Sequence, residues 1–188
     1  MNKPQIKVIL GSIREGRAGI KVAEWYMKTV KNLDTADFEL LDLKDYPLPL
    51  FADAELPGMR QGDHANPEVN RWLKKLESGD GFIFVTPEYN HSYTSVLKNA
   101  IDYAYKEWVG KPIGFVGYGG FAGGARAVEQ LRLVAAELRM YSVRDQVVVP
   151  AVWAAFDQDG QLIGAEAHAK NALALTENVI SLANKLRA

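Results

Sequence analysis

Five short apolar runs alternate with longer amphipathic stretches along the chain, and this alternation predicts the secondary structure. The runs are apolar almost throughout, as expected for strands that are covered on both faces. Between them, apolar residues recur at a spacing near 3.6, which predicts helices that bury one face. The predicted strands cover residues 6–10, 38–43, 81–85, 112–117 and 146–150, and the predicted helices cover residues 18–31, 68–77, 95–105, 122–140 and 165–186.

Strands that alternate with helices in this way pair in parallel through right-handed crossovers. The pattern therefore predicts an α/β doubly wound sheet, and no repeat, low-complexity tract or linker divides residues 1–188 into more than one domain. Residues 44–67 depart from the pattern, because prolines and glycines interrupt them repeatedly. A surface loop of this length is usually functional, which makes it a candidate to shape a ligand pocket.

Composition removes several classes of function. The 188 residues include no cysteine, which excludes disulfides, cysteine zinc sites, iron–sulfur clusters and a thiol nucleophile. The 22 basic and 23 acidic residues give a net charge of −1, which argues against binding to nucleic acid or a membrane surface. The sequence contains no signal-peptide pattern and no apolar run near the roughly 18 residues that span a bilayer, so we expect a cytoplasmic protein. His64 and His168 lack any partner pattern and are predicted to be surface residues.

Doubly wound sheets bind ligands beyond the carboxyl ends of their strands, so the segment after each strand is informative. The segment after the first strand contains Ser12, Arg14 and Arg17, followed by Ala18 and Gly19 where a helix begins. Free N–H groups at a helix N-terminus bind anions, and arginine adds charged contacts to phosphate oxygens. The sequence here is neither a Walker loop nor a dinucleotide fingerprint. These residues predict a phosphate site, with an ordinary solvated loop as the alternative.

The segment after the third strand begins with Pro87, Glu88, Tyr89 and Asn90. Aromatic rings and an amide at the mouth of a sheet suit a flat heteroaromatic ligand, although a plain loop that caps the next helix is also possible. Glu88 and His91 form a single E-x-x-H pattern. Metal sites of the bundle type need two copies and further glutamates, so we predict no metal.

A glycine-rich segment follows the fourth strand. Gly117, Gly119 and Ala122 match the dinucleotide pattern G-x-G-x-x-G/A, but the full pattern needs an acidic residue about 20 positions later at the end of the next strand. Here that strand ends at Pro150, well beyond this spacing, and Ala151 and Val152 follow it. Gly119 and Gly120 are better explained as a loop whose backbone approaches the edge of a flat ligand. The common serine-hydrolase and zinc-protease motifs do not occur. We therefore assign no catalytic side chain.

Taken in order along the chain, these motifs resemble the NAD(P)H-dependent FMN reductase family, whose relatives reduce quinones, azo dyes and chromate. The resemblance implies a flavodoxin-like fold with strand order 2-1-3-4-5 and helices on both faces. It also implies noncovalent FMN, NADPH or NADH as co-substrate, a small-molecule electron acceptor, and a homodimer or homotetramer. The motifs are Gly-Ser-x-Arg-x-x-Arg at 11–17, Asp-Leu at 42–43 with Pro-Leu-Pro at 47–49, Pro-Glu-Tyr-Asn at 87–90, Leu-Lys-Asn-Ala-Ile-Asp at 97–102 and Gly-Gly-Ala-Arg-Ala at 123–127.

The family's binding residues can be carried over by position. The resemblance implies that Ser12, Arg14 and Arg17 hold the FMN phosphate, beside Ala18 and Gly19 at the start of the helix. It further implies that residues 87–90 line the isoalloxazine ring and that Gly119 and Gly120 close on its far edge. Many members have Ser-x-Pro-Gly where this chain has Thr94 and Ser95 after Ser92 and Tyr93, so the path of the backbone past the ring can differ here.

Other functions remain compatible with the sequence. A flavodoxin-type electron carrier has the same fold, although such carriers are strongly acidic and use Ser/Thr-rich phosphate loops, unlike this chain. A flavin or nucleotide sensor would bind a cofactor without turnover. An NAD-binding Rossmann enzyme would use the loop that starts at Gly117.

Overall fold

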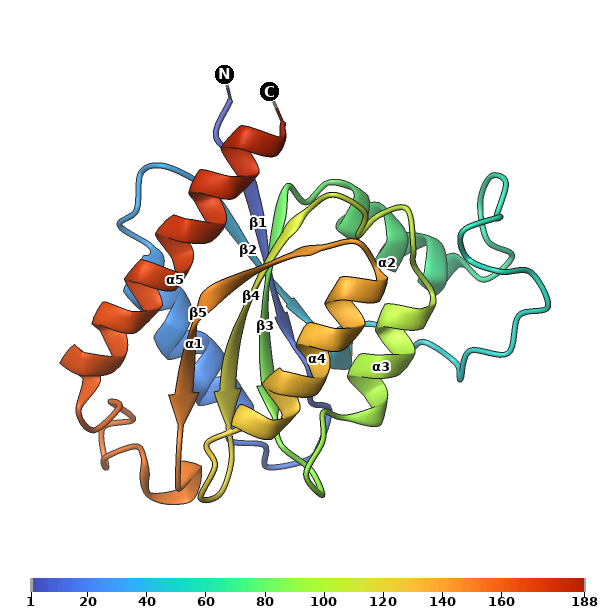
Figure 1. Cartoon of the computed structure of the whole chain (residues 1–188). Coiled ribbons are helices and arrows are strands. Elements are labelled where there is room, and N and C mark those ends of the chain that lie inside the picture. Colours follow the sequence, from blue (N-terminus) through green and yellow to red (C-terminus); the bar gives the residue numbers. More distant parts are fainter. Residues whose placement is uncertain (1, 188) are drawn as a thin grey trace.

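The sheet contains five parallel strands in the order β2-β1-β3-β4-β5, in a computed structural model that describes residues 2–187 (Figure 1). This order confirms the predicted flavodoxin-like fold. The chain lays β2 on one side of β1 and then crosses to place β3 on the other side, so the switch point lies between β1 and β3. The strands are β1 (Gln5–Leu10), β2 (Asp37–Asp42), β3 (Gly81–Pro87), β4 (Pro112–Tyr118) and β5 (Tyr141–Val149).

Helices cover both faces of the sheet, as predicted. Helices α1 and α5 pack on one face, while α2, α3 and α4 pack on the other with the larger aromatic cluster (Figure 1). No helix within residues 2–187 combines the length and the apolar character needed to cross a membrane. The helices are α1 (Gly19–Val30), α2 (Pro67–Glu77), α3 (Ser95–Asp102), α4 (Ala125–Glu137) and α5 (Ala165–Leu186).

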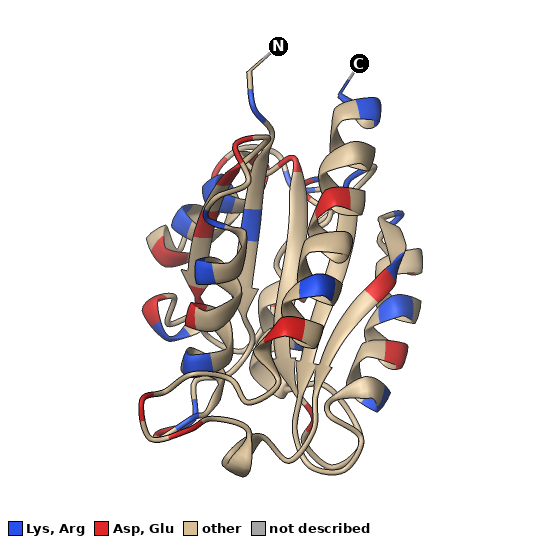
Figure 2. Cartoon of the chain, turned by 90° about the vertical axis from the view of Figure 1, so that its left-hand side faces the viewer, with Lys and Arg blue, Asp and Glu red and all other residues tan. Residues whose placement is uncertain are grey.

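The central strands are apolar because helices cover them on both sides. Every residue of β3 and β4 is buried. Charged residues lie mainly in the helices and loops, while most of the sheet is uncharged (Figure 2). Lys7 in β1 is an exception, and its buried ammonium group donates to a carboxylate oxygen of Glu39 at 2.7 Å. A buried lysine needs such a partner because an unpaired charge is costly to desolvate.

The predicted boundaries around α4 and β5 were wrong. The expected helix 122–140 is shortened at both ends, and β5 starts at Tyr141 rather than at residue 146. The register between β4 and β5 shifts between Ile113 and Phe115, which marks a bulge. Arg132 stabilises this region by donating to the carbonyl oxygens of Val143 and Arg144, at 2.6 and 3.1 Å. A polar, half-exposed edge strand lacks the apolar run used to predict strands, so its first half was missed.

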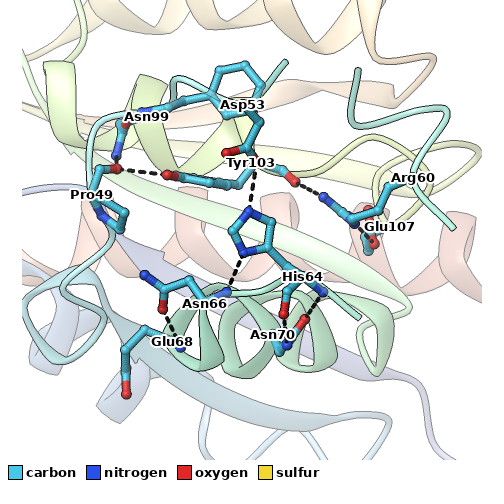
Figure 3. Close-up of polar contacts among 11 residues, drawn as sticks. Pro49, Asp53, Arg60, His64, Asn66, Glu68, Asn70, Asn99, Tyr103 and Glu107 are labelled. Carbon is cyan, nitrogen blue, oxygen red and sulfur yellow. Dashed lines mark hydrogen bonds and ion pairs between the residues drawn. The ribbon is translucent and has the colours of Figure 1, made fainter. Parts of the chain in front are cut away.

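The long loop after β2 is held against α3 by side-chain hydrogen bonds (Figure 3). It begins with a short 3₁₀ helix, Leu43–Asp45. The Pro49 carbonyl accepts from Asn99 Nδ2 at 2.8 Å and from the Tyr103 hydroxyl at 3.1 Å. Further along, Arg60 donates to the Tyr103 carbonyl at 3.0 Å. The loop therefore has a defined conformation although it lacks strands and long helices.

The His64 side chain in this loop is largely buried and forms hydrogen bonds through both ring nitrogens. The prediction that it is a surface residue was therefore wrong. Its Nδ1 accepts from the Asn66 amide at 2.8 Å, and its Nε2 lies 2.8 Å from Asp53 Oδ2. An Nδ1 that accepts carries no proton, so Nε2 carries the hydrogen and donates to the carboxylate. The ring also packs edge-to-face against Tyr103 (Figure 3). These contacts arise from residues that no sequence pattern groups together.

Candidate functional site

A cavity of about 370 Å³ opens at the carboxyl edge of the sheet, where the arrowheads of the strands end in Figure 1. Its walls come from the three loops identified in the sequence and from the segment after β5, and its size falls in the range of small-molecule sites. Residues 44–67 do not line it, so the long loop does not shape this cavity within its own chain. The lining residues are Arg14, Gly16, Arg17, Ala18, Pro87, Glu88, Tyr89, Tyr118, Gly119, Gly120, Val152 and Trp153.

The loop after β1 leads directly into α1 and leaves the N-terminus of this helix without a side-chain cap. Ala18 occupies the N-cap position, where its methyl group cannot accept a hydrogen bond. Gly19 is buried against the Tyr118 side chain. Together with the positive end of the helix dipole, the first N–H groups of α1 form a site suited to an anion.

The two arginines of this loop differ in their surroundings. Arg14 is exposed, and no hydrogen bond or ion pair within residues 2–187 involves its guanidinium. Arg17 is largely buried and forms an ion pair with Asp42 at the end of β2. Nη1 of Arg17 lies 2.8 Å from Asp42 Oδ1 and also donates to the Ser12 carbonyl. The structure thus presents Arg14, rather than Arg17, as the available cation.

Asn90 lies outside the cavity, in a tight turn of the loop after β3. Tyr89 and Ser92 exchange two backbone hydrogen bonds of 2.9 and 3.1 Å, and the residues between them, Asn90 and His91, both have positive φ angles. Asparagine tolerates this left-handed conformation better than most residues. Gln130 of α4 holds the turn by donating to the His91 carbonyl at 2.8 Å. Asn90 therefore has a conformational role in the structure, and its predicted contact with FMN stays a prediction.

The turn places the Tyr89 ring over the loop after β1. The Tyr89 hydroxyl lies 2.9 Å from the Ser12 side-chain oxygen, so these two segments meet through their hydroxyl groups. Ser12 itself is almost fully buried and does not line the cavity, although its partner Tyr89 does. Ser12 and Tyr89 are 77 positions apart in the chain, and the neighbouring ends of β1 and β3 bring them together.

Thr94 occupies the position where many family members have the proline of the Pro-Gly sequence, and its side chain forms two hydrogen bonds. Its side-chain oxygen accepts from the Leu97 amide at 3.1 Å and so caps α3. The same hydroxyl donates to the Gly11 carbonyl at 2.6 Å, which ties the start of α3 to the loop after β1. Proline at this position could make neither bond, so this chain uses a threonine cap to position the backbone here.

Glu88 connects the loop after β3 with the loop after β4. One carboxylate oxygen accepts from the Arg126 amide at 3.2 Å, which caps α4, and the other forms an ion pair with the Arg126 side chain. Burial alone would raise the pKa of Glu88, but the hydrogen bonds and charge of Arg126 outweigh it and lower this pKa. Glu88 is therefore ionised near neutral pH and paired with Arg126, so it does not act as a proton donor.

The glycine loop is held by the segment after β5. The amides of Ala151 and Val152 donate to the carbonyls of Gly120 and Gly119, both at 3.0 Å. Trp153 belongs to the short 3₁₀ helix Val152–Ala154, and 74% of its surface is exposed beside Gly120. An exposed indole at a cavity mouth offers a flat apolar surface to a ligand ring.

The cavity gathers most of the residues predicted from the sequence. Arg14, Arg17, Ala18, Pro87, Glu88, Tyr89, Gly119 and Gly120 line it, whereas Ser12, Gly19 and Asn90 do not. Sequence reasoning missed Gly16, Tyr118, Val152 and Trp153. Val152 and Trp153 belong to the segment after the fifth strand, which carries none of the motifs above. The rule that ligands bind beyond the carboxyl ends of strands could have indicated Val152 and Trp153.

Comparison with known proteins places this architecture in a family. The model of NADPH-dependent FMN reductases matches residues 4–154. The chain belongs to this family. It is 42% identical over 137 residues to an NAD(P)H-dependent FMN reductase of Schizosaccharomyces pombe, which covers 73% of this chain and 68% of the relative. It is also 34% identical over 147 residues to an NAD(P)H:quinone oxidoreductase of Solanum tuberosum, covering 75% of this chain and 73% of the relative.

A solved structure shares the whole fold of this family member. The flavoenzyme NAD(P)H:(acceptor) oxidoreductase FerB of Paracoccus denitrificans superimposes with a TM-score of 0.75 at 24% identity, and the match covers 97% of this chain and 98% of FerB. The family match makes the protein an oxidoreductase with FMN as cofactor and NAD(P)H as reductant. The predictions of family, enzyme class and cofactors are therefore confirmed.

The residues of the cavity fit FMN. Tyr118 is 3% exposed, and its buried hydroxyl has no hydrogen-bond partner within 3.5 Å among the described residues, although the Ser12 hydroxyl is near enough to lower its pKa. Burial raises the pKa of this hydroxyl, so it remains a protonated donor. Because buried donors are nearly always satisfied, an orphan beside the start of α1 is consistent with a bound polar group there. The uncapped helix and Arg14 suit the phosphate, and the walls near Tyr89 and Trp153 suit a flat ring.

The Glu88–Arg126 ion pair predicts a specific dependence of stability on pH. Because the folded-state pKa of Glu88 is lowered, the pair stabilises the fold above the unfolded-state pKa and stops doing so as pH falls through the folded-state pKa. Glu88→Gln is expected to cost about 1 kcal/mol of unfolding free energy at pH 7, a modest figure because Arg126 is half exposed. Urea unfolding at several pH values measures this difference.

Glu137→Gln provides the matched control, because Glu137 is an exposed carboxylate on α4, the helix that carries Arg126. Its unfolding free energy at pH 7 is expected to stay close to that of the wild type. The difference between Glu88→Gln and wild type is expected to shrink toward pH 3. A difference that persists unchanged in acid would show that the ion pair does not provide the stabilisation.

Proposed function

We propose that the protein transfers reducing equivalents from NAD(P)H to a quinone, free flavin, azo compound or similar small acceptor by a ping-pong scheme. The observation that supports this most directly is a single cavity lined both by the uncapped start of α1 with Arg14 and by the aromatic rings of Tyr89 and Trp153. With FMN in the cavity, the open side beside the exposed Trp153 would admit the two substrates to the flavin in turn. No side chain of the chain is needed as a nucleophile.

The chain's own residues would bind and orient the cofactor. The first N–H groups of α1, together with Arg14, would hold the phosphate, with Ala18 and Gly19 allowing close approach of the backbone. Pro87, Glu88, Tyr89, Gly119 and Gly120 would enclose the ring. When bound, FMN supplies the hydride and electron chemistry, and the protein contributes position and electrostatics.

Two exposed aromatic residues, one in the cavity wall and one in the glycine loop, would offer stacking surfaces to the acceptor. Trp153 is exposed beside Gly120, and Phe121 is fully exposed at the tip of the same loop. Exposed rings of this kind offer stacking surfaces to planar acceptors without specific polar contacts. A permissive choice of planar acceptors follows from this arrangement. The homodimer or homotetramer, and the cytoplasmic location, stay predictions.

The visible absorption spectrum of the purified protein tests the function first. Bound FMN is expected to give a yellow protein, and anaerobic addition of NADPH or NADH is expected to bleach it. Adding a quinone is expected to restore the colour and to sustain continuous NAD(P)H oxidation. Parallel double-reciprocal plots would support the ping-pong scheme, because release of the first product separates the two half-reactions.

Two results would contradict the proposal. A yellow protein that oxidises NAD(P)H only negligibly with any acceptor would be an electron carrier or a flavin sensor. A colourless protein that binds NAD without flavin would instead use the glycine loop as a dinucleotide site. The strand order and the family match speak against this last outcome.

A further inference from the structure

Arg17 lies at the phosphate end of the cavity, but its guanidinium is already engaged by the protein. Nη1 lies 2.8 Å from Asp42 Oδ1 and also donates to the Ser12 carbonyl, while Nη2 pairs with Asp42 Oδ2. The side chains of Arg17 and Asp42 are only 11% and 15% exposed. Both terminal nitrogens of Arg17 thus have acceptors within the chain, in the two-pronged geometry that arginine forms with carboxylates.

Asp42 is fixed independently of Arg17. It is the last residue of β2, directly opposite Leu10 at the end of β1. Its Oδ1 also accepts from the Lys44 amide at 2.9 Å and caps the 3₁₀ helix Leu43–Asp45. A carboxylate held by the sheet and by this cap is a rigid anchor. The ion pair therefore ties the loop after β1 to the edge strand.

The charges on this loop then fall into two groups. Arg17 and Asp42 neutralise each other, so the pair adds little net positive charge to the cavity. The cationic groups that remain available are Arg14 and the positive end of α1. Arg17 therefore holds the loop in shape, while Arg14 remains available to bind an anion.

We propose that Arg17 is a positioning residue: through Asp42 and the Ser12 carbonyl it holds residues 12–18 in the shape that directs Arg14 and the first N–H groups of α1 toward the FMN phosphate. This inference rests on the proposed function and assigns Arg17 no direct contact with the phosphate. It also gives Asp42, a residue outside the cavity lining, an indirect role in cofactor affinity.

Paired substitutions distinguish positioning from direct binding. Arg17→Lys keeps the charge but not the two-pronged fork, and Asp42→Asn keeps a side-chain acceptor for the Lys44 amide but removes the ion pair. Both flavin-free variants are titrated with FMN and with riboflavin, which lacks the phosphate. Each is expected to bind FMN about tenfold more weakly, with riboflavin affinity nearly unchanged. The double variant is expected to bind no more weakly than either single variant, because the two residues act as one unit.

Two further variants complete the experiment. Asp34→Asn removes an exposed ion pair with Lys3 elsewhere on the molecule, and its FMN affinity is expected to equal that of the wild type. Arg14→Ala is expected to weaken FMN binding, and Asp42→Asn is expected to cost less in the Arg14→Ala background than in the wild type, because the ion pair acts in part through Arg14. Far-UV circular dichroism and thermal unfolding of each flavin-free variant establish that it is folded before affinity is compared.

One pattern of results would overturn the inference. If Asp42→Asn binds FMN as tightly as the wild type or more tightly, whatever the effect of Arg17→Lys, then Asp42 does not position Arg17 for cofactor binding and the inference is wrong. A wild-type chain that binds no FMN would instead overturn the proposed function and remove the basis of the inference. The wild-type titration therefore separates the two failures.

Discussion

Gly124→Ala is expected to remove most of the stability of the protein, with a loss of about 4 kcal/mol or more. Gly124 precedes α4 with a φ of 87°, a conformation that is costly for any residue with a side chain. An added Cβ would also lie 2.5 Å from the Tyr118 nitrogen and 2.7 Å from the Gly117 Cα. These neighbours are backbone atoms of a buried central strand, so they cannot move aside as a flexible side chain could.

Urea unfolding monitored by circular dichroism measures this loss, and Gly62→Ala is the matched control. Gly62 has a φ of 77°, but an added Cβ there would meet no atom within 4 Å. The control is therefore expected to lose only the conformational cost of about 1–2 kcal/mol. Similar losses for the two variants would show that the contact with β4 is not responsible.

Gly19→Ala is expected to weaken FMN binding by about a hundredfold, the scale expected when one or two hydrogen bonds to a charged phosphate are lost. The new Cβ would lie 2.8 Å from Cζ of Tyr118 and closer still to its hydroxyl oxygen. Because Tyr118 is buried in the central sheet, the start of α1 is expected to move instead. Alanine favours helix by about 1 kcal/mol over glycine, which does not remove this clash.

Titration of the flavin-free variant with FMN measures the effect, and Gly19→Ala/Tyr118→Phe is the test of its cause. Deleting the Tyr118 hydroxyl removes the nearest atom, so Gly19→Ala is expected to weaken FMN binding less when it is compared with Tyr118→Phe than when it is compared with the wild type. Tyr118→Phe alone is expected to change the stability of the flavin-free protein little, because this hydroxyl has no partner among the described residues. Wild-type FMN affinity in Gly19→Ala would show that α1 does not hold the phosphate.

The fold followed from local signals wherever a strand is buried on both faces. Residues 81–85 and 112–117 are continuous apolar runs, and both lie within the central strands β3 and β4. The first half of β5 gave no such signal, because residues 141–146 are mixed and half exposed. Their extended conformation depends on pairing with β4 and on Arg132 of α4. An edge strand of this kind is specified by its neighbours more than by its own residues.

Topology likewise predicted which loops form the cavity, but not which side chains pair within them. Parallel strands end at one edge of the sheet, so the segments after them had to meet, and Arg14, Tyr89 and Gly120 do line one cavity. The partners of individual side chains could not be obtained in this way. Arg17 and Asp42 are 25 positions apart, and Glu88 and Arg126 are 38 apart.

By itself, the sequence determined the doubly wound sheet, the loops that carry the site and the kind of ligand that suits them. Apolar periodicity and the free N–H groups of a helix are local properties, so residues close together in the chain are enough to reveal them. Only the tertiary structure decided which charges are available to that ligand. A side chain can bind a ligand only when no closer partner occupies it, and β2 supplies such a partner to Arg17 and none to Arg14.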